Sequence, residues 1–194
     1  AKSAPQKHLF EEVVYVLSGH GNTTIETSDG RKHSFEWGPK SLFALPLNSW
    51  YQHFNGSGSE PARFFSVNSM PIVFNLFHSA DFIFNTPRDF TDRFDGDPEY
   101  FSGKGKAYPG RVWDTNFIAD ARSFALEDWK ERGAAGKNVM LELANGSMAA
   151  HISEFPVGTY KKAHRHGPGF NVIVIKGKGF SLFWREGEEP KRYD

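Results

Sequence analysis

Two histidines separated by a single residue, His164 and His166, are the side chains in this sequence with the clearest potential for chemistry. Residues two apart in an extended strand project from the same face, so both imidazoles would point in the same direction. A Gly-Pro-Gly turn at 167–169 follows them, and the β-branched run at 170–175 predicts a buried strand that ends at Gly177. Two neutral imidazoles on the inward face of a strand would supply half of a binding site for a divalent transition metal.

Charge and composition exclude several other classes of protein. The 194 residues contain 23 Lys and Arg against 23 Asp and Glu, so no basic field is present to bind a nucleic acid through its phosphates. Cysteine is absent, which excludes disulfides, thiolate metal sites and cysteine nucleophiles from this chain and fits a reducing compartment. No apolar run approaches the length that a membrane span requires. We therefore expect a cytoplasmic protein that binds neither nucleic acid nor membrane.

The elements that would position these histidines are predicted to be strands. In the first 77 residues, runs of β-branched and aromatic residues alternate with turns such as Asp29 and Gly30, and the last predicted strand lies at 72–77. Short strands at nearly even spacing are typical of an all-β sandwich or barrel. The stretch at 85–122 is rich in Gly, Pro and Asp and predicts an irregular connector, with a short helix near 86–94.

The stretch after the connector predicts a second domain. Residues 123–132 have helical character, and an Asn-Gly hairpin turn joins predicted strands at 138–143 and 148–155. The predicted divisions are an N-terminal domain at 1–84, a connector at 85–122 and a C-terminal domain at 123–194.

An internal repeat relates the two domains. With an offset of 166 − 8 = 158 residues, His166 aligns with His8 without a gap, and the glycines that end the following strand also align. The second copy ends one residue before the counterpart of Trp37, so the later strands of the first copy have no equivalents in it. Unpaired apolar strand edges are a liability that proteins avoid. We therefore expect a longer polypeptide, a homo-oligomer or a second chain that completes the C-terminal barrel.

These residues resemble two sequence motifs of the cupin superfamily, and specifically of a bicupin, which has two jelly-roll domains. The first motif is a glycine, five residues, His-x-His, three or four residues, Glu, six residues and a glycine. The second copy resembles it at Gly158, His164, His166 and Gly177, with Phe170 or Asn171 at the glutamate position. The first copy resembles it at Gln6, His8, Glu12 and Gly19, with Gln6 in place of the first histidine.

The second cupin motif, which includes a ligand histidine, is similar to residues 38–55. Tyr51 stands in place of that histidine, and His53 lies two residues further on, where it would face the same side of a strand. The resemblance covers roughly residues 6–77 and 138–194.

The resemblance implies an all-β fold of two cupin jelly rolls, which are double-stranded β-helix domains, with the second one incomplete. It also implies a divalent metal, with Fe(II) favoured over Mn(II), Ni(II) or Zn(II), held by three imidazoles and a carboxylate. The favoured ligands are His164 and His166, and the weaker candidates are His8, Glu12 and His53. The positions that depart from the expected ligand types are Gln6, Tyr51, Phe170 and Asn171. Trp50 and Phe43 are candidates for the substrate pocket, with core packing as the alternative.

The function that this resemblance implies is a metal-dependent enzyme, an Fe(II) dioxygenase or related oxidoreductase that acts on a small, aromatic, carboxylated molecule. One alternative is a non-catalytic cupin that binds a small molecule or serves as a scaffold, because Gln6, Tyr51 and Phe170 replace ligand types. A second alternative is a metal-dependent isomerase, decarboxylase or lyase that uses the same site. For His8 and Glu12, the alternative to metal binding is an ion pair or hydrogen bond inside the barrel.

Overall fold

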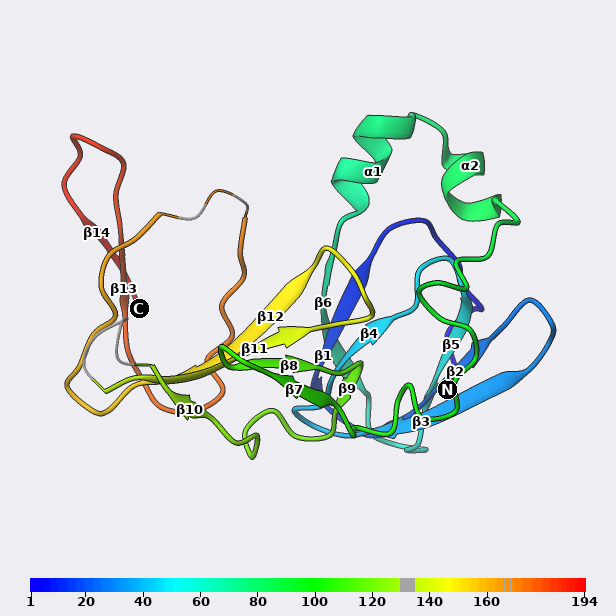
Figure 1. Cartoon of the computed structure of the whole chain (residues 1–194), viewed down its shortest axis with the longest axis horizontal. Coiled ribbons are helices and arrows are strands. Elements are labelled where there is room, and N and C mark those ends of the chain that lie inside the picture. The colour runs from blue at the N-terminus through cyan, green and yellow to red at the C-terminus, as the bar shows by residue number, and fades with distance from the viewer. Residues whose placement is uncertain (130–134, 166, 168) are drawn as a thin grey trace. The chain divides into compact units, whose positions relative to one another are not determined.

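The computed structural model describes residues 1–129, 135–165, 167 and 169–194 (Figure 1). The chain divides into two compact units, Ala1–His164 and Arg165–Asp194, and each is described by itself. Strands dominate the described secondary structure, with only two short helices among these residues. The predicted all-β fold class is therefore confirmed.

The first unit contains a jelly roll, built from two antiparallel sheets (Figure 1). The larger sheet has the order β6-β1-β4-β9, with strands at Arg63–Asn68, Glu12–Ser18, Leu42–Leu45 and Phe117–Ile118. The smaller sheet has the order β3-β2-β5, with strands at Lys32–Trp37, Gly21–Glu26 and Trp50–Asn55. Backbone bridges pair Lys2 with Phe54 and Gln6 with Tyr51, so the N-terminal segment runs antiparallel beside β5.

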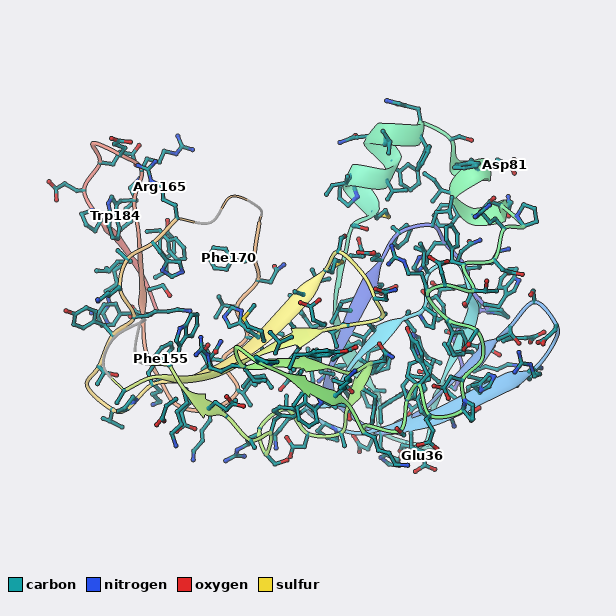
Figure 2. All side chains as sticks on the ribbon, viewed as in Figure 1. Glu36, Asp81, Phe155, Arg165, Phe170 and Trp184 are labelled. Atoms are coloured by element: carbon teal, nitrogen blue, oxygen red, sulfur yellow. The ribbon has the colours of Figure 1, made fainter. Side chains whose placement is uncertain are left out.

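The core of the roll follows from the two-residue alternation of its strands. In β3, Phe35 and Trp37 are buried, whereas the intervening Glu36 is exposed (Figure 2). This alternation places apolar side chains on one face of the sheet and polar side chains on the other. Phe43 of β4 is fully buried and packs edge-on against Phe35, with ring centroids 5.1 Å apart. Aromatic residues of the predicted connector complete this core cluster, namely Phe94, Phe101 and Phe117.

A further sheet of the first unit has the order β10-β11-β8-β7, and β12 also pairs with β11. Its strands lie at Glu127–Asp128, Lys137–Glu142, Val112–Asp114, Lys106–Tyr108 and Ala149–Glu154. β8 runs parallel to β11, and the other pairs are antiparallel. The helix predicted at 123–132 is wrong over its described part, because Glu127 and Asp128 pair with β11. Phe124 and Leu126 are two residues apart, a spacing that places both side chains on one face of a strand but not of a helix.

Two helices follow β6, α1 at Met70–Phe77 and α2 at Ala80–Asn85. The strand predicted at 72–77 and the helix predicted near 86–94 are therefore wrong. Pro71 in the first turn favours a helix start, since its fixed φ suits that position and its missing N–H has no partner to lose there. The Ser79 side chain accepts a hydrogen bond from the Phe82 N–H and so caps α2. Within the described ranges, no helix is long and apolar enough to cross a membrane.

The second unit contains one β-hairpin, formed by β13 at Ser181–Phe183 and antiparallel β14 at Lys191–Tyr193. The Phe170 ring stacks on that of Phe183, with centroids 6.2 Å apart. The run at 170–175 was predicted as a buried strand, and this is wrong for the structure described here. Val172 and Val174 are each 70% exposed, and β-propensity without a packed face does not form a strand.

Glu11, next to Glu12 in the sequence, links the roll to the turn between β11 and β12. Its Oε2 accepts hydrogen bonds from the Ser147 hydroxyl at 2.6 Å and the Met148 N–H at 3.2 Å, and Arg93 Nη1 donates to its Oε1 at 3.0 Å. Burial acts to raise the pKa of Glu11, but the hydrogen bonds from Ser147 and the ion pair with Arg93 outweigh it and lower that pKa. The carboxylate is therefore held charged in the folded state.

We expect Glu11→Ala to lower the free energy of unfolding by about 2 kcal/mol, because it leaves the partly buried donors of Arg93 and Met148 without their acceptor. Urea unfolding of the wild-type chain and the variant measures this difference. Glu36→Ala is the matched control, since this glutamate is exposed on β3, and we expect it to change stability by less than about 0.5 kcal/mol. Equal stabilities of the Glu11 and Glu36 variants would contradict a structural role for this link.

Candidate functional site

A pocket of about 390 Å³ opens on the first unit where the N-terminal segment meets β5 and α2. Its polar floor and apolar walls come from segments that are distant in the sequence. The residues that line it are Pro5, Gln6, Lys7, His8, Phe10, Glu12, Trp50, Tyr51, Asn68, Phe84 and Asn85. This volume lies at the lower end of the range for small-molecule sites in proteins.

His8 is fixed in this pocket by two contacts with one residue, Phe10. Its Nδ1 lies 2.8 Å from the Phe10 carbonyl oxygen, and the two rings stack with centroids 3.7 Å apart. A carbonyl oxygen only accepts hydrogen bonds, so Nδ1 carries a proton. His8 Nε2 then points to Glu12 Oε2 at 3.1 Å and to Tyr51 Oη at 3.0 Å. A histidine that binds a metal is held in the same way, through the ring nitrogen opposite the metal.

Glu12 and Tyr51 complete the floor of the pocket. Tyr51 Oη lies 3.2 Å from both Glu12 Oε2 and Gln6 Oε1, and the Ser66 hydroxyl donates to Glu12 Oε1. Burial acts to raise the pKa of Glu12, but hydrogen bonds from His8 and Ser66 outweigh it and lower that pKa. Burial and the neighbouring Glu12 carboxylate raise the pKa of Tyr51 far above its usual range. The floor therefore combines a carboxylate with a neutral phenol.

His53 is half-buried next to Tyr51 of this floor, and it is held by a chain of hydrogen bonds. Trp37 Nε1 donates to Thr23 Oγ1 at 2.9 Å, and Thr23 Oγ1 lies 2.7 Å from His53 Nδ1. Thr23 is fully buried, so its hydroxyl proton is directed to Nδ1, and a neutral His53 carries its ring proton on Nε2. Burial lowers the pKa of His53 to about 4, although Glu12 acts in the opposite direction.

The other predicted site residues do not share one location. Trp50 lines the pocket, whereas Phe43 is fully buried in the core. His164 is exposed, and its Nδ1 lies 2.8 Å from the Lys162 carbonyl oxygen. His166 lies outside the described residues. In the second unit, both Phe170 and Asn171 are exposed.

A divalent metal does not fit the polar set in the first roll. The set offers one imidazole and one carboxylate, and its other members are a phenol with a raised pKa and a carboxamide. Across the part of the chain that the structure describes, no group of three or more His, Cys, Asp and Glu side chains could hold a metal ion. Cupin-type centres with imidazole and carboxylate ligands need more strong donors than this. His8, Glu12, Tyr51 and Gln6 instead form a hydrogen-bonded network.

The resemblance to the two cupin motifs implied that Gln6, His8, Glu12 and Tyr51 share one site, and in the structure all four line one pocket. It did not predict Lys7, Phe10 or Phe84. Phe84 could not be placed from the sequence, because the helix that carries it was not predicted. Phe10 could have been predicted from its position. It lies two residues after His8, so its carbonyl oxygen can reach the imidazole Nδ1.

Comparison with known proteins gives one significant similarity among curated sequences, and no family profile matches the chain. A 5-aminosalicylate 1,2-dioxygenase of a Comamonas species is 31% identical over 64 residues, which are 33% of this chain and 15% of that protein. Among solved structures, the oxalate decarboxylase of Lactobacillus farciminis with formate has 12% identity and a TM-score of 0.39, covering 72% of this chain and 46% of that one. The Bacillus subtilis oxalate decarboxylase studied for its Mn(II) centres has 15% identity and a TM-score of 0.38, covering 72% and 41%.

This chain spans less than half the length of each of these proteins. The jelly-roll sheets and the meeting of four motif positions in one pocket are independent of those similarities. They agree with the resemblance to the cupin motifs in the sequence, and the sequence similarity to the dioxygenase covers a third of this chain.

Proposed function

We propose that this chain functions as a metal-dependent cupin enzyme, an Fe(II) dioxygenase or related oxidoreductase that acts on a small aromatic carboxylate. The observation that carries this proposal is the similarity to 5-aminosalicylate 1,2-dioxygenase. The named substrate of that protein is a benzene ring with a carboxylate, a hydroxyl and an amino group.

We further propose that His164 and His166 of the second repeat are metal ligands. Their spacing places two imidazoles on one face of an extended segment, and the repeat aligns His166 with His8. A bound Fe(II) would supply the redox chemistry with O₂, which none of the side chains of this chain supplies. Mn(II), Ni(II) or Zn(II) would suit the same imidazole ligands.

The test is the metal content of the chain after expression in iron-supplemented medium and anaerobic purification. We expect close to one equivalent of a divalent metal, measured by atomic emission, and O₂ uptake when 5-aminosalicylate is added. The double substitution His164→Ala and His166→Ala is expected to abolish both. The matched control replaces two exposed histidines elsewhere, His20→Ala and His78→Ala, and is expected to retain both.

Three outcomes overturn this proposal. Less than about a tenth of an equivalent of metal in the wild-type chain would favour a non-catalytic binding protein. Metal retained in the double variant would exclude His164 and His166 as the main ligands. Bound metal without O₂ uptake, but with turnover of the same compound, would favour an isomerase, decarboxylase or lyase.

A further inference from the structure

We propose that the pocket of the first roll is a metal-independent binding site for a small planar carboxylate that carries a hydrogen-bond donor at its opposite end. This inference goes beyond the proposed function, because it assigns a ligand to a pocket whose side chains do not fit a metal. It depends on the floor, the walls and the rim of the pocket.

The floor needs no cation to be stable, and it still offers acceptors. Tyr51 Oη lies within 3.0 to 3.2 Å of His8 Nε2, Glu12 Oε2 and Gln6 Oε1. The hydroxyl therefore occupies the centre of the set, and its single proton can serve only one of the two oxygens, Glu12 Oε2 or Gln6 Oε1. Glu12 Oε1 already accepts from Ser66. The oxygen that Tyr51 does not serve keeps acceptor capacity, which an O–H or N–H group of a ligand would use.

The walls of the pocket are aromatic and favour a planar ligand. Phe10 is 6% exposed and its ring is fixed on one side by its stack with His8. Phe84 of α2 packs edge-on against Phe10, with ring centroids 6.1 Å apart, and Trp50 contributes a third ring that is 46% exposed. Flat faces of this kind bind another ring by stacked or edge-on contacts. The volume of about 390 Å³ suits a ligand with a single ring.

The rim of the pocket carries one cation, Lys7, among the lining residues. Its Nζ donates to the Thr86 carbonyl oxygen at 2.9 Å and lies 5.4 Å from the centroid of the Trp50 ring. An ammonium group has three N–H donors, so this contact with Thr86 leaves two that a carboxylate could accept. Asn68 and Asn85 also line the pocket, and Asn85 Nδ2, which donates one N–H to Asp81 at 2.8 Å, has a second N–H to donate. A ligand with its anionic group at Lys7 and its donor group at Glu12 and Gln6 would complement both ends.

The experiment uses the chain with His164→Ala and His166→Ala, dialysed against EDTA, so that failure of the proposed metal site does not affect it. Binding of 4-hydroxybenzoate, which has a carboxylate and a donor at opposite ends, is measured by calorimetric titration. We expect one site per chain and the same dissociation constant, within about twofold, after Zn(II) or Mn(II) is added. Benzoate lacks the donor and phenol lacks the carboxylate, so each should bind at least about tenfold more weakly.

Lys7→Met tests the rim. It is expected to weaken 4-hydroxybenzoate binding by about tenfold and to leave phenol binding unchanged, because only the former has a carboxylate. Lys106→Met is the matched control, since Lys106 Nζ also lies over an aromatic ring, 4.9 Å from the centroid of Tyr108, but outside the pocket. The proposal is overturned if 4-hydroxybenzoate does not bind, if it binds only with added metal, or if Lys7→Met and Lys106→Met have equal effects.

Discussion

Restoring two histidines in the first roll is expected to create a divalent-metal site where the natural chain has none. The changes are Gln6→His and Tyr51→His, made on the background that lacks His164 and His166. We expect the affinity for Zn(II) or Mn(II) to rise by on the order of a thousandfold or more, because two poor donors become imidazoles. His8 and Glu12 are already oriented, through the Phe10 carbonyl and the Ser66 hydroxyl respectively. Competition with a chromophoric chelator measures the affinity.

The single substitutions separate this effect from a general change in the pocket. Each one alone restores only a third strong ligand, so each should give an intermediate affinity. Gln6→Asn with Tyr51→Phe is the control, because it perturbs the same positions without adding a metal ligand, and it should leave metal binding as weak as before. A correctly folded double-histidine variant with no gain in affinity would show that these positions are not equivalent to the cupin ligand positions.

Most of the strands in the first roll could be predicted because local signals and tertiary packing agree there. The Asp29 and Gly30 turn and the alternation that buries Phe35 and Trp37 both favour the observed sheet. At 72–77 the signals disagree, since the residues are apolar and partly β-branched but follow Pro71, and the helix start prevails. At 170–175, β-propensity has no packing partner to support it in the described unit, and no strand forms.

The candidate site shows the same division between local and long-range information. The resemblance to the cupin motifs could place Gln6, His8, Glu12 and Tyr51 in one site, because it implies which positions of neighbouring segments face each other. It could not show that Tyr51 Oη would lie among the other three, since that depends on side-chain length within the folded roll. It also could not supply Lys7 as a rim cation, because its position depends on the Thr86 carbonyl 79 residues away.

Stability between pH 7 and about pH 5 is expected to depend on His53. Its pKa is lowered by burial from 6.5 to about 4, so the unfolded chain binds a proton in a range where the folded chain does not. The contribution of neutral His53 to folding stability is therefore complete above about pH 6.5 and is lost as the pH falls toward about 4. The difference between the folded and unfolded pKa values corresponds to about 3 kcal/mol. Urea unfolding at several pH values in this range measures the slope.

The titration of Glu11 and Glu12 does not contribute to the stability change between about pH 6.5 and pH 5. Each has a pKa lowered from 4.5, so its contribution to stability is present above that pH and is lost only as the pH falls below it. His53→Asn removes the titrating group while an amide oxygen still accepts from Thr23, so this variant should lose the slope between about pH 6.5 and pH 5. His20→Asn, at an exposed position, should keep it. A wild-type slope in the His53 variant would mean that the buried hydrogen-bond chain from Trp37 does not hold this imidazole neutral.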